Sequence, residues 1–339
     1  MGVTVDAVPR ATLGRAAVLV GWVPLFALVP VALFLPEIPP TYRYLPLAAS
    51  ALLFGMPHGA VDYVALPRAR SGRVDPGGVA LVAALYLLAG GVYLALWFLA
   101  PVPAAVLFVL LTWVHWGQGD LYVLWDLYEA DHVDDTVQRV LTVLVRGGLP
   151  MLVPLVGFPE RYRAVVGTFV EPFGADVGAW PVFGVGPRLA LAAGFAAVTA
   201  LALGRGWRRA GGRAWRLDAA ETGLLWAFFV LVPPVLAVGA YFCLWHSVRH
   251  IARVLLLDSW TVAALRERRW LHAGGKFALE AAVPTVLALA LVAALWVTVP
   301  GSVETLAGVV GLYLVAIAVL TLPHTVVVVW LDREQGIWS

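Results

Sequence analysis

Long apolar runs, separated by short charged or Gly/Pro-rich breaks, make up most of this chain. A helix needs about 20 mostly apolar residues to cross a hydrocarbon core about 30 Å thick. Runs of roughly this length cover residues 13–35, 44–66, 79–100, 104–125, 136–157, 187–204, 279–299 and 305–331. The run over 136–157 is weaker, because arginines, glycines and prolines interrupt it. The pattern predicts an all-α integral membrane protein, a polytopic helical bundle.

One further apolar stretch, from Glu221 to Leu257, is too long for a single crossing at 1.5 Å per residue. Two helices broken near Gly239 fit better, and Pro233-Pro234 offers another break point. With this split the chain has about ten transmembrane helices, and eight or nine are the alternatives. We expect one polytopic domain over residues 1–339.

Arginine-rich loops support this count, because short cytoplasmic loops collect Lys and Arg. The basic loops span residues 67–77, 205–218 and 258–277, and ten crossings place all three on the side of the short N-terminal tail 1–12. We therefore expect a multi-pass protein of the plasma membrane with a cytoplasmic N-terminus, and a first apolar run that is retained as a helix. The acidic loop 126–135 is expected to be solvated, and 158–186 is predicted to be an interfacial segment.

Composition narrows the functional classes. Apolar residues make up 61% of the 339 residues and charged residues 13%, against about 45–50% and about 25% in soluble domains. A water-soluble globule is excluded. A net charge of +2 is too small to indicate the basic surface that a nucleic-acid-binding protein needs. The single cysteine, Cys243, leaves His, Asp and Glu as the candidate metal ligands.

Histidines supply the candidate chemistry. Two of the seven, His132 and His272, fall in polar loops, where solvation explains them. The other five lie inside apolar runs: His58, His115, His246, His250 and His324. Ionisable residues at membrane depth are costly and usually face a functional cavity or the bundle interior. A single one could be a neutral imidazole bonded to a neighbouring helix, but five favour a shared site.

The spacing of these histidines indicates a metal. His246 and His250 are four residues apart, so on a helix both imidazoles share a face and can reach one ion. In the ten-helix arrangement all five histidines lie on helices that run in one direction, at broadly middle depths. Imidazole suits Zn, Cu, Fe and Ni alike, so ligand type alone does not name the metal.

Polar and aromatic residues accompany the histidines. Asp62 follows His58 by one turn, and Gln118 and Asp120 follow His115. Such groups commonly accept the second N–H of a metal-bound imidazole, although hydrogen bonding at a helix end is the alternative. Arg249 and Arg253 flank the His246/His250 pair and either snorkel to the interface or pair with these carboxylates. Four aromatics beside the histidines suggest a flat hydrophobic ligand: Trp113, Trp116, Phe242 and Trp245.

The ordered motifs Gly55-Met-Pro-His-Gly-Ala-Val-Asp62, His115-Trp-Gly-Gln-Gly-Asp120, Trp245-His-Ser-Val-Arg-His250 and Pro323-His324 resemble the Brp/Blh-type microbial membrane β-carotene 15,15′-dioxygenase family. The resemblance implies cleavage of the central double bond of β-carotene by O₂ to two all-trans-retinal, which supplies a microbial rhodopsin. It also implies a non-haem Fe²⁺ bound by His58, His115, His246 and His250. His324 resembles a family histidine whose role, as a ligand, a support for a ligand or part of the substrate pocket, stays open.

Other functions remain as alternatives at this point. A membrane desaturase or hydroxylase usually carries several HxxxH or HxxHH boxes near the cytoplasmic face, whereas this chain has one HxxxH inside an apolar run. A bis-His haem protein for electron transfer would show a Soret band. A transporter or carotenoid-binding protein without catalysis would release its polyene intact.

Overall fold

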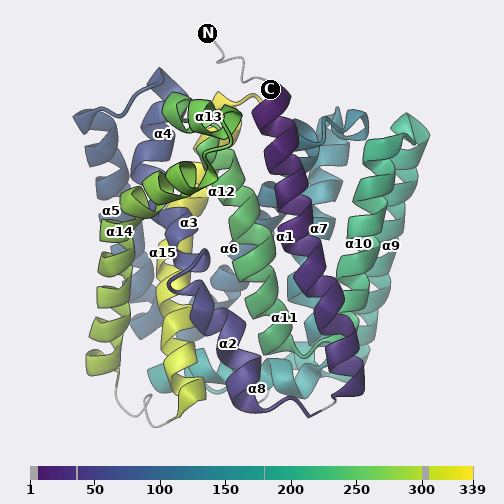
Figure 1. The fold of residues 1–339 in the computed structure, drawn as a ribbon. Helices are drawn as coiled ribbons and strands as arrows, with labels where there is room; N and C mark the ends of the chain where they lie inside the picture. Colours follow the sequence, from purple (N-terminus) through teal and green to yellow (C-terminus); the bar gives the residue numbers. More distant parts are fainter. Residues whose placement is uncertain (1–6, 36, 179, 300–304, 339) are drawn as a thin grey trace.

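The computed structural model describes residues 7–35, 37–178, 180–299 and 305–338, and within these ranges the regular structure is entirely helical (Figure 1). Residues 1–6 of the expected N-terminal tail lie outside the described residues, and α1 begins at Ala7. The first half of the chain forms α1 (Ala7–Phe34), α2 (Pro40–Ser50), α3 (Gly55–Ala60), α4 (Asp62–Ser71), α5 (Pro76–Leu99), α6 (Pro101–Tyr122) and α7 (Thr136–Gly157). The predicted all-α polytopic fold is confirmed.

The second half continues the bundle. Its helices are α8 (Pro159–Val170), α9 (Val185–Ala210), α10 (Arg213–Leu231), α11 (Pro234–Ala240), α12 (Ser247–Leu255), α13 (Ser259–Arg266), α14 (Trp270–Thr298) and α15 (Leu306–Glu334). Two π-helical segments, η1 (Val123–Leu127) and η5 (Tyr241–His246), extend α6 and join α11 to α12. Short 3₁₀ turns are η2 (Asp131–Val133), η3 (Glu171–Phe173) and η4 (Pro181–Phe183).

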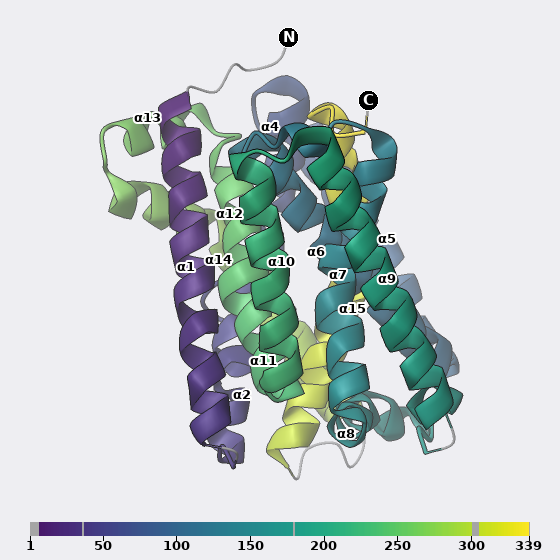
Figure 2. The same ribbon diagram turned by 90° about the vertical axis from the view of Figure 1, so that its right-hand side faces the viewer.

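Eight segments in the described ranges are long and apolar enough to cross a membrane, and one of them combines α2, α3 and α4. Two more run lengthwise through the bundle, α10 and the continuous stretch from α11 through η5 to α12 (Figure 2). At 1.5 Å per residue, each of the two is about 30 Å long, which matches a hydrocarbon core. Eight candidate spans among the described residues is one of the counts that the sequence left open, and ten stays a prediction that counts α10 and the α11–α12 stretch as crossings.

The break in the stretch from Glu221 to Leu257 falls at Pro233-Pro234, so the placement near Gly239 was wrong. Helix α10 ends at Leu231 and α11 begins at Pro234, because proline lacks an N–H and restricts the residue before it. Gly239 instead lies within α11, where a Cβ would come 2.8 Å from the backbone N of Leu47. The missing side chain thus serves close packing of α11 on α2.

The two ends of the bundle differ in charge. The three basic loops and the acidic loop 126–135 lie at the end where α1 begins (Figures 1 and 2). Ion pairs join segments there, with Arg10 3.0 Å from Asp126 and Arg209 2.7 Å from Asp134. Helix α8, from the predicted interfacial segment, lies at the opposite end and packs against the start of α15.

Candidate metal centre

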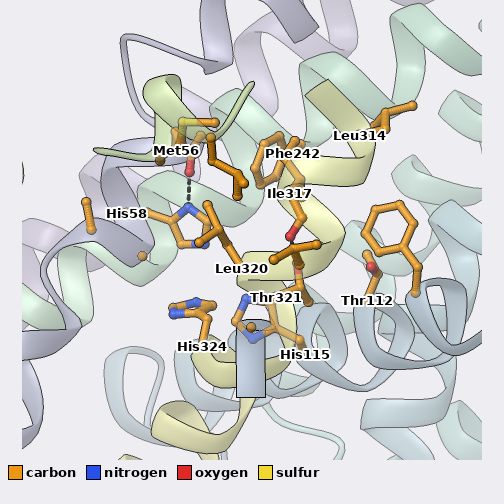
Figure 3. A pocket seen from close by; sticks show the side chains of 18 of the residues that line it. Met56, His58, Thr112, His115, Phe242, Leu314, Ile317, Leu320, Thr321 and His324 are labelled. Carbon is orange, nitrogen blue, oxygen red and sulfur yellow. Dashed lines mark hydrogen bonds between the residues drawn. The ribbon is translucent and has the colours of Figure 1, made fainter. Parts of the chain in front are cut away.

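Five helical segments bring their histidines to one place in the bundle interior. The side chains come from His58 on α3, His115 on α6, His246 at the end of η5, His250 on α12 and His324 on α15. All five are 6% exposed or less. His115 has its ring centroid 4.6 Å from that of His246 and 4.5 Å from that of His324, and His58 lies 5.3 Å from His250. The structure therefore gathers all five histidines that occur in apolar runs, and Figure 3 shows three of them facing one another.

Local irregularities in the helices aim these side chains. His58 lies on a short helix that stops at Val61, whose φ of −95° and ψ of 6° separate α3 from α4. His246 ends a π-helical turn, a feature found frequently at functional sites. Gly119, one turn after His115, lets the His246 ring approach, because a Cβ there would lie 3.1 Å from His246 Cε1.

Three of the five imidazoles have a buried Nε2 without a protein partner in the described part of the chain, and the other two contact each other through Nε2. Nε2 of His58, His250 and His324 are buried and have no hydrogen-bond partner among the described residues. Nε2 of His115 and Nε2 of His246 are 2.9 Å apart. On His58 the other nitrogen, Nδ1, donates to the carbonyl of Gly55 (Figure 3), so Nε2 carries the lone pair. Buried unpaired polar atoms are rare, and several aimed at one another are the donor set that a metal ion requires.

Ligand atoms fall into two groups, each within 4.8 Å: His58, His115 and His246 form one, and Asp62, His250 and His324 form the other. Asp62 Oδ2 accepts a 2.7 Å hydrogen bond from His324 Nδ1 and a 2.6 Å hydrogen bond from the Tyr86 hydroxyl. The carboxylate that follows His58 in sequence thus holds His324. Because Nδ1 of His324 donates this hydrogen bond, the lone pair of the ring lies on Nε2.

Gln118 and Asp120 face away from the histidines. The Gln118 amide donates to Asp332 Oδ2 over 3.0 Å. Asp120 accepts from Trp245 Nε1 over 3.0 Å and pairs with Arg249 at 3.2 Å and Arg146 at 3.3 Å.

Asp120 belongs to a buried network of charges beside the histidine cluster. Arg249 lies 2.5 Å from Glu221, and Arg146 lies 2.9 Å from Glu221 and 2.7 Å from Asp218. Arg253 pairs with Asp332 at 2.8 Å. Arg249, which lies between the two histidines in sequence, and Arg253, which follows them, are therefore both held by carboxylates inside the bundle.

Two histidines lie outside the cluster. His272 is exposed on α14, as expected for a solvated residue. His132 is 1% exposed, and its Nε2 lies 2.9 Å from Asp218 Oδ2. The interpretation of His132 as a solvated loop residue was wrong, because its loop folds back onto the charge network.

An apolar cavity of about 990 Å³ adjoins the histidines and is lined by His58, His115 and His324. Trp116 and Phe242 also line it, together with aliphatic residues of α5, α14 and α15. The other two aromatics noted in the sequence are engaged elsewhere. Trp113 donates to the carbonyl of Leu144, and Trp245 donates to Asp120 beneath the Arg249 guanidinium. Tyr86 is a cavity residue that the sequence did not single out, and the available signal was a tyrosine near the middle of an apolar helix.

The fold and the site together define an integral membrane protein in which a buried cluster of five histidines adjoins an apolar cavity. A sequence model of the β-carotene 15,15′-dioxygenase family matches residues 49–332, a range that contains all five histidines. The chain belongs to this family, as the motifs indicated.

Named relatives agree. The chain is 54% identical over 329 residues to a protein named probable β-carotene 15,15′-dioxygenase Blh from Halobacterium salinarum, covering 97% of this chain and 95% of the relative. It is 34% identical over 316 residues to the probable β-carotene 15,15′-dioxygenase Brp of the same organism, covering 86% of this chain and 85% of the relative. No solved structure matches the chain.

Proposed function

We propose that this protein cleaves the central double bond of β-carotene with O₂ to give two molecules of all-trans-retinal, at an iron ion held by His58, His115, His246 and His250. The observation that carries the proposal is the convergence of unpaired imidazole nitrogens at the wall of a large apolar cavity. Membership of the family, and the names of its relatives, supply the substrate and the reaction.

The donor set suits the proposed metal. Imidazole binds Fe²⁺ well, and zinc, which imidazole also binds, has no redox chemistry for a reaction with O₂. Bound iron would supply the activation of O₂. One O₂ and one carbon–carbon double bond balance two aldehydes, so the reaction needs no reductant.

Residues of the chain would hold the metal, orient the His324 ring and bind the apolar substrate. The histidines hold the metal as neutral ligands, and Asp62 keeps the His324 ring oriented with Nε2 toward the cluster. The cavity, at the upper end of the range of about 300–1,000 Å³ for ligand sites, excludes water and holds an apolar molecule. Trp116 and Phe242 offer flat faces beside His58 and His246.

Selectivity for the central bond is a matter of positioning. Cavity residues on α15 run from Val310 to His324, which at 1.5 Å per residue is about 21 Å. Helix α8 packs against α15, and its Val166 and Phe169 line the cavity together with Val310, so we infer that α8 closes this end. A polyene inserted until it meets this closed end would place one particular bond at the histidines.

The orientation proposed for the protein follows from its loops. The end of the bundle that carries the basic loops faces the cytoplasm, with the protein in the plasma membrane, because short cytoplasmic loops are enriched in Lys and Arg. Retinal released there would serve a rhodopsin in the same membrane.

Production of the protein in cells that accumulate β-carotene tests the activity. We expect the orange colour to fade and retinal to be extracted in its place, whereas a His250→Ala variant at equal membrane abundance leaves the colour unchanged. Persistent colour with no retinal, despite insertion of the wild-type protein, contradicts the proposal. Recovery of intact carotene bound to the purified protein would favour a carotenoid-binding role.

A further inference from the structure

The cavity has an exposed rim formed by two helices. Among the described residues that line it, the exposed ones are Ala83, Leu87 and Gly91 on α5 and Val283 and Leu287 on α14. They repeat every four residues, so each set occupies one face of its helix. Leu87 is 77% exposed and Leu287 is 66% exposed, although both also face the cavity. The cavity therefore reaches the protein surface between α5 and α14.

This rim is suited to hydrocarbon. All five rim residues are apolar or glycine. Leu87 lies midway along α5, which spans Pro76–Leu99, so it is about 17 Å from either end of that helix. A position this far from both ends of a membrane-spanning helix faces the bilayer core rather than water.

The helices leave room at this place. Figure 1 shows α5 and α14 on the same flank of the bundle, and Figure 2, turned by 90°, shows them apart from left to right. Helix α5 packs on α4, α6 and α15, and α14 packs on α3, α13 and α15. At Gly91 an added Cβ would meet no atom within 4 Å, so the rim beside it is open.

We propose that the space between α5 and α14 is a lateral portal, through which the apolar substrate moves directly from the bilayer core to the histidines. The inference rests on the proposed function, because it takes a lipid-dissolved polyene as the ligand. A route through water would expose the whole hydrocarbon chain of the polyene to water, which is unfavourable in proportion to its apolar area. A portal at mid-membrane depth avoids that exposure. Two of the three α5 rim residues, Ala83 and Gly91, are small, so few side-chain atoms project into the opening on this side.

The test compares tryptophans on the rim with tryptophans beside it. The portal variant carries Leu87→Trp and Leu287→Trp. The control carries Leu88→Trp and Val286→Trp, at neighbouring positions that are 72% and 63% exposed and do not line the cavity. Each protein, in nanodiscs, is mixed with vesicles containing β-carotene under anaerobic conditions, and the rate and end point of carotene transfer are followed by absorbance.

The portal variant should take up β-carotene about tenfold more slowly than the control, because bulk at the rim hinders association, and should reach the same end point with the same iron content. Equal rates in the two variants, with a wild type that cleaves carotene, overturn the portal alone. An unchanged rate with a lower end point also overturns it, since the residues would then be part of the binding wall. A wild type that neither takes up nor cleaves carotene overturns the proposed function and the portal with it.

Discussion

Asp62 and His324, which are 262 positions apart in the chain, are joined by a 2.7 Å hydrogen bond from His324 Nδ1 to the carboxylate. A carboxylate can only accept, so the imidazole donates and its Nε2 keeps a lone pair. Tyr86 donates to the same carboxylate oxygen over 2.6 Å. The three side chains, from α4, α15 and α5, fix the orientation of the fifth histidine.

Asp62→Asn should weaken iron binding by about 10- to 100-fold if His324 joins the four proposed ligands, because this is the usual cost of removing a carboxylate that supports a metal-binding imidazole. Tyr86→Phe should act in the same direction with a smaller effect, because the His324–Asp62 bond persists. Competition with a Fe²⁺ chelator measures both affinities. Glu160→Gln, an exposed carboxylate on α8, is the control. Unchanged affinity in Asp62→Asn would show that His324 does not bear on the metal.

Each of His58→Ala, His115→Ala, His246→Ala and His250→Ala should lose iron and cleavage together, because each removes one buried donor nitrogen. His272→Ala, which changes the exposed histidine of α14, should keep both. Elemental analysis of the purified variants gives the metal content. A variant that retains stoichiometric iron and full turnover removes that histidine from the ligand set.

Glu221→Gln should destabilise the protein by about 3–5 kcal/mol, because it leaves Arg146 and Arg249 buried with less opposite charge. Thermal unfolding in detergent measures the loss. Asp134→Asn, in an exposed ion pair with Arg209, should shift the unfolding temperature little. Equal shifts in the two variants would show that the buried network does not stabilise the bundle.

The sequence predicted the main features of this fold because apolar runs and basic loops report directly on membrane crossings. It also revealed the five histidines, since an ionisable residue such as His115 is conspicuous among apolar neighbours. The sequence did not predict which side chains on different helices form hydrogen bonds with one another. Asp62 follows His58 by four residues but bonds to His324, and His132 is in a polar loop that folds back onto Asp218.

The burial of charged residues within or at the edge of apolar runs could not be predicted from the sequence either. Arg146 looked like an interruption of a weak crossing and Glu221 like the edge of one, yet both are buried together. Local periodicity cannot tell a boundary charge from one that meets a partner on another helix. The break at Pro233-Pro234 rather than Gly239 has a similar origin, because a glycine that serves helix packing resembles one that ends a helix.

Val310→Trp should shorten the cavity at the end closed by α8. We expect less retinal from β-carotene, with a shift toward off-centre products and unchanged iron content, because the substrate can no longer slide fully inward. Chromatography of the apocarotenoids measures this. Leu306→Trp, one turn earlier and exposed, is the matched control. Retinal as the sole product at the wild-type rate in Val310→Trp would exclude the closed end as the element that positions the substrate.

The central claim is that a histidine-bound iron at this cavity splits β-carotene at its centre. The most direct measurement uses purified wild-type protein reconstituted with Fe²⁺, supplied with β-carotene and O₂, and quantifies carotene consumed against retinal formed. We expect two retinal molecules per β-carotene consumed, with turnover abolished by removing iron and restored by returning it. Iron-independent turnover, or consumption of carotene without retinal, would contradict it.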